Sequence, residues 1–309
     1  MRPKDTSIYM ELDDRYYYRG SWFQLIRPMT LTGTITPILV GTSLAAATTS
    51  IRYDILLALV VSALLVQAAT NIINDYYDFK NGQDQEKWVH SIDKDSTIHG
   101  PSHNSLPFVV GTMFVLAAII GFWIALISSL WVIVAGSLGI LAGYVYSAGS
   151  HSFSSIGLGE VVAAIFLGPL ITILAYTVQG NPLSFQAVMV SLPFTLLIAS
   201  MILTNNIRDL EKDKEFRNTL AKTLGRAKAV YLLTSLLVLS YFSILLLIAF
   251  RLLPWQSSIV LLATPLAGRL IWSFRNGAAR KEEVSGMKWA ARNHWGFGLL
   301  FFIGLWLFG

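Results

Sequence analysis

The stretch NIINDYYDFKNGQD (71–84) follows directly on the apolar run LLALVVSALLVQAAT (56–70). Together with the residues before it, this run approaches the ~20 apolar residues that cross the hydrocarbon core of a bilayer. The stretch itself carries three carboxylates, Asp75, Asp78 and Asp84, where a lipid-buried helix would end. Ionisable groups are costly near lipid and usually have a function there. The stretch therefore predicts a membrane helix that ends in a polar site.

Apolar runs of this length recur along nearly the whole chain. Of the 309 residues, 54% are apolar and 13% are charged, and the absence of cysteine excludes disulfides and thiolate metal ligands. A soluble helical protein would show polar faces at helical spacing, and these are mostly absent. We therefore predict an all-α, polytopic membrane bundle of about nine transmembrane helices, which forms a single domain over 1–309 with a polar tail at 1–21. The predicted spans are 30–49, 54–77, 105–126, 130–147, 158–178, 185–205, 229–250, 256–274 and 291–308.

Lysine and arginine residues are distributed unevenly between the two sides of this predicted bundle. If the N-terminus is cytoplasmic, the cytoplasmic segments hold all of the 23 Lys and Arg residues except Arg52 and Arg251. This is the asymmetry that the positive-inside rule describes. We therefore predict a multi-pass protein of the cell inner (cytoplasmic) membrane, with its N-terminus and its active site on the cytoplasmic side. Basic loops beside an anionic leaflet also account for the net charge of +5 without a nucleic acid partner.

Two predicted spans end in the same pattern of asparagine and aspartate. Asn71, Asp75 and Asp78 fall at i, i+4 and i+7, which places them on one helical face. The segment TNNIRDLEKD at the end of another span repeats the pattern at i, i+4 and i+8, with Asn205, Asp209 and Asp213. Polar helix ends at a membrane surface are common, but two matched clusters on one side are not explained by solvation alone.

Clustered carboxylates repel one another and need a compensating cation. Hard oxygen ligands suit Mg²⁺, which keeps several waters and is commonly shared with substrate phosphates. Two such clusters facing each other across a cavity would hold two Mg²⁺ ions with a diphosphate between them. The basic side chains beside the second cluster would neutralise the remaining phosphate charge; these are Arg208, Lys212, Lys222 and Arg226. The pattern therefore predicts a site for a diphosphate with an apolar tail.

These segments resemble the UbiA-type intramembrane prenyltransferases, and the resemblance covers nearly the whole chain. It is carried by WFQLIRPMTLTGTITPILVG (22–41), ATNIINDYYDFKNGQD (69–84), LGE (158–160) and LTNNIRDLEKDKEFRNTLAKTLGR (203–226). The resemblance implies a Mg²⁺-dependent transferase of menaquinone biosynthesis, which joins a polyprenyl chain from its diphosphate to an aromatic acceptor. The implied acceptor is 1,4-dihydroxy-2-naphthoate or a similar compound, which loses its carboxylate as carbon dioxide.

The resemblance also implies roles for individual residues. The catalytic residues are expected to be Asp75, Asp209 and Arg27. The diphosphate is expected to contact Asn71, Asn205, Arg208, Lys222 and Arg226. The Mg²⁺ ligands are expected to be Asp75, Asp78, Asp84, Asp209 and Asp213.

Three further residues are candidates on general physical grounds. The rings of Tyr144 and Tyr146 can stabilise an allylic cation, although tyrosines also anchor helices at membrane interfaces. Glu160 is an intramembrane carboxylate and so a functional candidate, although a capping or packing role explains it nearly as well.

Other functions remain open at this point. The loops at 90–105 and 147–155 depart from the family pattern where the acceptor would be handled, so a family member with a different acceptor is one alternative. A transporter is another, although its ionisable groups would normally lie near the bilayer midplane instead of at helix ends. A non-catalytic membrane scaffold is the third.

Overall fold

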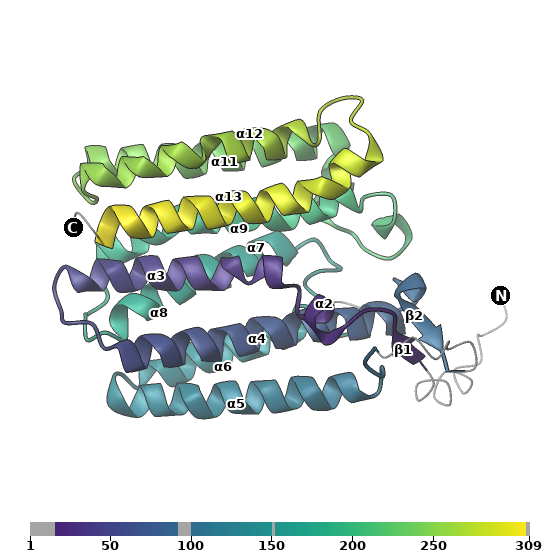
Figure 1. Cartoon of the computed structure of the whole chain (residues 1–309), viewed down its shortest axis with the longest axis horizontal. Helices are drawn as coiled ribbons and strands as arrows, with labels where there is room; N and C mark the ends of the chain where they lie inside the picture. The colour runs from purple at the N-terminus through teal and green to yellow at the C-terminus, as the bar shows by residue number, and fades with distance from the viewer. Residues whose placement is uncertain (1–15, 92–99, 150–151, 307–309) are drawn as a thin grey trace.

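The computed structural model describes residues 16–91, 100–149 and 152–306. The polar tail up to residue 15, residues 92–99 of the loop at 90–105 and residues 150–151 of the second atypical loop lie outside the described residues. The chain forms a bundle of helices that run side by side (Figure 1). The main helices are α3 (Thr32–Ala46), α4 (Tyr53–Lys80), α5 (Ser105–Ile127), α6 (Trp131–Val145), α9 (Phe185–Arg208), α11 (Arg226–Ala249), α12 (Thr264–Trp272) and α13 (Arg280–Trp306).

One further transmembrane segment is divided into three pieces. It consists of α7 (Gly159–Ile165), the π-helical turn η4 (Phe166–Leu170) and α8 (Ile171–Thr177). Pro169 lies inside the π-helical turn and has no backbone N–H to donate, which explains the local change of helical pitch. Together these helices confirm the prediction of a helical membrane bundle.

We predicted about nine transmembrane helices, but fewer helices are both long enough and apolar enough to cross a membrane. Among the described residues, five helices are long and apolar enough, and a bent pair at Trp22–Thr30 and Thr32–Ala46 makes up to six. The remaining predicted spans also contain helices. They are shorter (α6), divided between the 3₁₀ helix η6 (Trp255–Ala263) and α12, or charged over their first half (α13).

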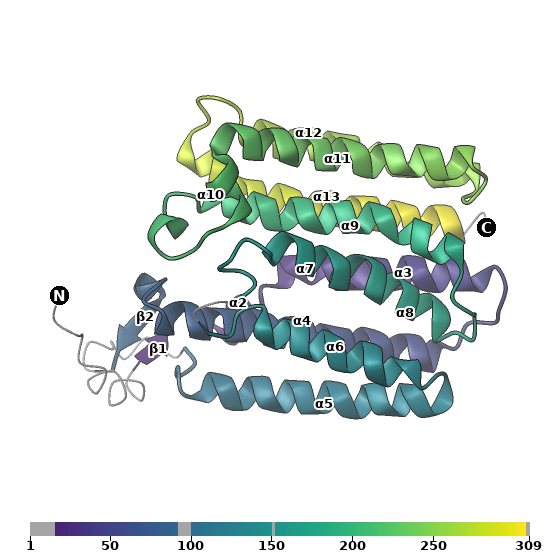
Figure 2. The ribbon, with the colours of Figure 1, turned by 180° about the vertical axis from the view of Figure 1, so that it is seen from behind.

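The helices pack in an order that places α3 and the α7–α8 segment between α4 and α9 (Figures 1 and 2). Helices α5 and α6 lie along α4 at one edge, whereas α11 and α12 form the opposite edge (Figures 1 and 2). Between them, α3 packs on α8 and α13, and α9 packs on α7, α11 and α13. The carboxyl ends of α4 and α9, where the two acidic clusters were predicted, therefore lie at the same end of the bundle.

A small two-stranded sheet lies beyond the carboxyl end of α4 (Figure 1). Strand β1 (Tyr16–Tyr18) pairs antiparallel with β2 (Trp88–His90), so the segment before α3 is attached to the segment after α4. The short helix α2 (Trp22–Ile26) and the turn η2 (Pro28–Thr30) then lead into α3. Arg27, between them, has φ of 54°, and the amide of Asn71 on α4 donates to Ile26 O (2.7 Å) and Thr30 Oγ1 (3.1 Å). These bonds hold the Arg27 turn against α4.

Candidate active site

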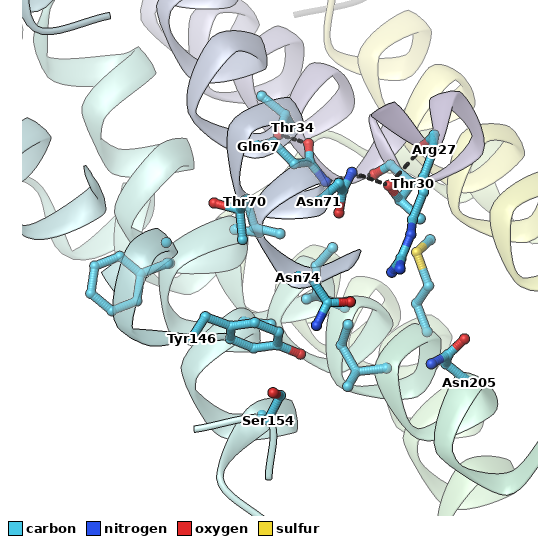
Figure 3. A pocket seen from close by; sticks show the side chains of 18 of the residues that line it. Arg27, Thr30, Thr34, Gln67, Thr70, Asn71, Asn74, Tyr146, Ser154 and Asn205 are labelled. Atoms are coloured by element: carbon cyan, nitrogen blue, oxygen red, sulfur yellow. Dashed lines mark hydrogen bonds between the residues drawn. The ribbon is translucent and has the colours of Figure 1, made fainter. Parts of the chain in front are cut away.

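A cavity of about 690 Å³ opens between the carboxyl ends of α4 and α9. Its polar end is lined by side chains from both acidic segments, and Figure 3 shows Arg27, Asn74, Asn205 and Tyr146 arranged around it. Its other end runs between α4, α6 and the divided α7–α8 segment, where the lining is apolar. This apolar lining includes Leu59, Val66, Gly139, Val162, Leu167 and Leu174. The cavity thus combines a charged end with an apolar extension.

The first acidic cluster gathers three carboxylates at the charged end. Oxygen atoms of Asp75, Asp78 and Asp84 all lie within 4.8 Å of one another. Asp78 and Asp84 line the cavity, whereas Asp75 is only 1% exposed and lies behind the lining. Three carboxylates this close repel one another strongly unless cations lie beside them.

Two basic side chains on the same side of the cavity supply part of this compensation. Arg27 Nη2 lies 3.0 Å from Asp75 Oδ1, and Lys87 Nζ lies 2.9 Å from the same oxygen. Lys87 also pairs with Asp84. Because Lys87 directly precedes β2, the small sheet fixes the position of this cation.

The remaining cations come from the segment that follows α9. Lys212 pairs with Asp84 and lies 2.6 Å from Glu86, and Arg217 pairs with Asp78. Burial by itself would raise the pKa of Asp84, but the ammonium groups of Lys87 and Lys212 outweigh it and hold the pKa at about 2. These ion pairs join the two acidic segments across the cavity.

The second cluster is less compensated than the first. Arg208 binds Asp209 through two hydrogen bonds of 2.9 and 2.5 Å, and it donates to Asn205 Oδ1 at 2.6 Å. Asp213 lines the cavity without an ion-pair partner within 4 Å among the described residues. Burial raises the pKa of Asp213 to about 6, because the neighbouring carboxylates add to it and the lowering effect of Arg217 is insufficient. A cation would be stabilised most at this point.

The structure brings together most of the side chains that the sequence singled out. The cavity lining contains Arg27, Asn71, Asp78, Asp84, Tyr146, Asn205, Arg208, Asp209 and Asp213. The other candidates lie outside the lining. Asp75 and Glu160 are buried directly behind it, whereas Tyr144, Lys222 and Arg226 make their contacts elsewhere.

The three distant side chains each have a structural partner. The hydroxyl of Tyr144, which is 43% exposed, lies 3.1 Å from that of Tyr77. Lys222 Nζ donates to the carbonyl oxygens of Lys214 (2.7 Å) and Arg217 (3.1 Å), so it closes the loop after α9. Arg226 pairs with Glu283 at 2.5 Å. Lys222 and Arg226 therefore do not reach the cavity, although they lie close to the second acidic motif in the sequence.

Two cations that were not singled out lie at the charged end instead. Lys87 and Arg217 both line the cavity and pair with the first acidic cluster. Arg217 also donates to Gln83 Oε1 at 3.0 Å. Both lie in polar loops after α4 and α9, so helical periodicity does not relate them to the carboxylates. The only signal in the sequence is that these two loops are long and polar.

Glu160 acts on the cavity through a neighbour. Its Oε1 accepts a hydrogen bond of 2.7 Å from the amide of Asn206, and Asn206 lines the cavity. Its Oε2 is buried without a hydrogen-bond partner among the described residues. A carboxylate can only accept from the Asn206 Nδ2, so Glu160 fixes which way this amide is turned.

The donor set fits a divalent metal ion. All the acidic ligands are hard oxygens that converge from two segments, and Asp213 has no ion-pair partner within 4 Å among the described residues. Mg²⁺ is usually bound through few carboxylates together with waters and substrate phosphates, and a cavity of about 690 Å³ leaves room for them. Asp78, Asp84, Asp209 and Asp213 are positioned to hold it.

Comparison with known proteins agrees with this architecture. The model of the UbiA prenyltransferase family matches residues 34–307. The chain belongs to the UbiA prenyltransferase family. It is therefore a membrane prenyltransferase with several apolar helices.

Individual UbiA-family relatives are similar over nearly their full length. A protein of Bacillus subtilis (strain 168) named 1,4-dihydroxy-2-naphthoate octaprenyltransferase is 32% identical over 92% of this chain and 91% of its own. A protein of Mycobacterium tuberculosis with the same name is 29% identical over 86% of this chain and 89% of its own. Among solved structures, a UbiA homolog from Archaeoglobus fulgidus bound to GPP and Mg²⁺ superposes with a TM-score of 0.60. It is 15% identical and covers 91% of this chain and 99% of its own, so this likeness concerns the fold.

Proposed function

We propose that this UbiA-family enzyme transfers a polyprenyl chain from its diphosphate to 1,4-dihydroxy-2-naphthoate, with decarboxylation and dependence on Mg²⁺. The observation that carries the proposal is the single cavity, whose charged end joins two carboxylate clusters and whose other end is apolar. The names of the relatives support the choice of acceptor. The proposed product is a demethylmenaquinol, and the proposed location is the inner membrane with the active site on the cytoplasmic side.

The charged end is suited to hold the diphosphate. Asp78 and Asp84 on one side, with Asp209 and Asp213 on the other, would hold Mg²⁺, which when bound neutralises the leaving diphosphate as a Lewis acid. Arg27, Lys87, Lys212 and Arg217 pair with carboxylates of the first acidic segment and add positive charge at this end of the cavity. Since these cations already lie at the cavity, little rearrangement is needed when the leaving group gains charge.

Asp75 has a different proposed role from the carboxylates in the lining. It accepts from both Arg27 and Lys87, at 3.0 and 2.9 Å, and is almost fully buried. A buried carboxylate between two cations holds both side chains in place. We therefore propose that Asp75 positions these two cations and acts on the metal site through them.

The apolar end is suited to hold the isoprenoid tail and to exclude water. Ionisation of an allylic diphosphate leaves a carbocation that water would capture, so the reacting carbon must lie in a dry environment. The lining from α6 and the α7–α8 segment is apolar, and Tyr146 lies between this part and the charged end. The ring of Tyr146 is positioned to stabilise the cation, and the Asn206 amide that Glu160 orients is positioned to contact the acceptor.

The first test is an assay of the purified full-length protein in detergent. Polyprenyl diphosphate, 1,4-dihydroxy-2-naphthoate and Mg²⁺ are supplied, and the prenylated product and carbon dioxide are followed by mass spectrometry. We expect product that disappears on addition of EDTA and returns with Mg²⁺. Product with hydroxybenzoate or homogentisate but not with the naphthoate would refute the assigned acceptor.

Matched variants test the assignment of the site. Asp75→Asn and Asp209→Asn are each expected to lower turnover by at least about a hundredfold, as losses of electrostatic stabilisation usually do. Asp54→Asn serves as the control, because Asp54 is an exposed carboxylate at the opposite end of α4. Normal turnover in either site variant, with unchanged protein in the membrane, contradicts the proposed metal site.

A further inference from the structure

Helices α12 and α13 carry a group of basic side chains that the proposed reaction does not use. Lys281, Lys288 and Arg292 occur at i, i+7 and i+11 on α13, a spacing that places them on one helical face, and all three are exposed. Arg269 on the neighbouring α12 is exposed as well. None of the four lines the active-site cavity.

Two of these side chains converge on one aromatic ring. The guanidinium carbon of Arg292 lies 4.9 Å from the ring centroid of Trp289, and that of Arg269 lies 5.9 Å from the same centroid. A shallow hollow beside them is lined by Arg269, Trp272, Pro265 and Gly268. Arginine side chains from two helices therefore meet at one surface point.

The acidic residues nearby are already paired with other cations. Glu282 pairs with Arg275 at 2.8 Å, and Glu283 pairs with Arg226 at 2.5 Å and with Arg280 at 3.3 Å. Within the described residues, no carboxylate lies within ion-pair distance of Arg269 or Arg292. Like charges on adjacent turns and helices destabilise one another, so an anion from outside would be favoured between them.

The position of this group along the helices indicates where the anion comes from. All charged residues of α13 lie between Arg280 and Arg292, and after the buried Asn293 and His294 the rest of the helix is apolar and aromatic. Exposed apolar side chains, Leu262 before α12 and Trp295 on α13, continue the surface beyond the arginines. This change from basic to apolar surface, with tryptophans at the boundary, is typical of the level of lipid headgroups.

We propose that the surface formed by Arg269 on α12 and by Trp289 and Arg292 on α13 binds an anionic phospholipid. The phosphate contacts the guanidinium groups of Arg269 and Arg292, and the acyl chains lie along the exposed apolar side chains beyond them. Arginine suits this role because its planar fork contacts two phosphate oxygens at once and also stacks on the tryptophan ring. This lipid site is separate from the prenyl diphosphate site and does not depend on the proposed acceptor.

The test measures lipid binding to the purified full-length protein in zwitterionic detergent. Phosphatidylglycerol and phosphatidylcholine of equal chain length are titrated separately, and bound lipid is counted by native mass spectrometry. Each arginine beside an anionic headgroup contributes about a fivefold factor in affinity, so the double variant R269Q/R292Q is expected to bind phosphatidylglycerol about 25-fold more weakly. Phosphatidylcholine binding is expected to be unchanged.

A charge-matched control separates this site from general attraction. The double variant R52Q/R251Q removes two exposed arginines from the opposite end of the bundle and is expected to change the affinity less than twofold. Equal weakening in both double variants, or no weakening in R269Q/R292Q, overturns the proposal. Stabilisation by inorganic phosphate alone overturns it as well, because the site would then bind a soluble anion. The single variant R292Q, with an expected fivefold loss, provides the same test should the double variant not fold.

Discussion

Replacing Arg217 by glutamine tests the connection between the two acidic segments. The Arg217 guanidinium pairs with Asp78 across 139 positions of sequence, and the two side chains are only 13% and 11% exposed. Gln83 loses its hydrogen bond from Arg217 as well. The substitution therefore leaves a buried carboxylate without its main partner.

The expected loss of stability follows from this burial. Removing one partner of a buried ion pair typically costs about 3–5 kcal/mol. We expect the lower figure of about 3 kcal/mol, because Arg27 also lies near Asp78 and keeps part of the compensation. For a protein of this size, such a loss lowers the melting temperature by about 6 °C.

The assay compares thermal unfolding in detergent with EDTA and with Mg²⁺. A metal ion bound at Asp78 replaces the missing positive charge, so we expect Mg²⁺ to stabilise the Arg217→Gln variant more than the unaltered protein. Turnover is expected to fall about a hundredfold even at saturating Mg²⁺, because one positive charge beside the diphosphate is lost.

A matched arginine provides the control. Arg226 pairs with Glu283 at 2.5 Å but is 38% exposed and lies outside the cavity. Arg226→Gln is therefore expected to cost less than about 1 kcal/mol and to show no added response to Mg²⁺. If both variants respond equally to Mg²⁺, or if Arg217→Gln keeps full turnover, the reasoning about the Arg217 bridge is refuted.

Two further predictions concern the apolar end of the cavity and the binding of the aromatic substrate. At Gly139, which lines the cavity, an added Cβ meets no atom within 4 Å, so Gly139→Leu should fold normally and shorten the space for the isoprenoid. We expect kcat/KM to fall about tenfold for long-chain relative to short-chain donors, whereas Gly111→Leu, on α5 with equally open space outside the cavity, should leave this ratio unchanged. Glu160→Ala removes the carboxylate oxygen that accepts the hydrogen bond from Asn206 and so orients its amide. We expect KM for the aromatic substrate to rise about tenfold, with little change in KM for the prenyl diphosphate. Glu160→Gln keeps a side-chain oxygen that can accept this hydrogen bond, so its KM for the aromatic substrate should lie close to that of the unaltered protein. An equal rise in KM for both substrates would instead indicate that the substitution disturbs the whole site.

The class of fold and the nature of the site could be predicted from local sequence patterns. Apolar runs predict lipid-buried helices because backbone hydrogen bonds in lipid must be made within the segment itself. The positions of Asn71, Asp75 and Asp78 on one helical face follow from helical periodicity alone. The carboxylate clusters at the ends of α4 and α9 were therefore predictable without any knowledge of packing.

The number of long spans was less predictable. Hydropathy indicates where a segment is apolar, but it does not show where a helix bends, shortens or changes pitch. The π-helical turn at Pro169 and the division between η6 and α12 depend on neighbouring helices as well as on their own residues.

The roles of the basic residues were decided only by the tertiary structure. Lys222 and Arg226 follow the second acidic motif closely, yet they bind loop carbonyls and Glu283, whereas Lys87 and Arg217 line the cavity. Helical periodicity is fixed by bonds that reach four residues along the chain, so it determines which carboxylates share a face. The pairing of Arg217 with Asp78 depends on how the bundle places the segment after α9 beside the end of α4, and no pattern within either segment contains that information.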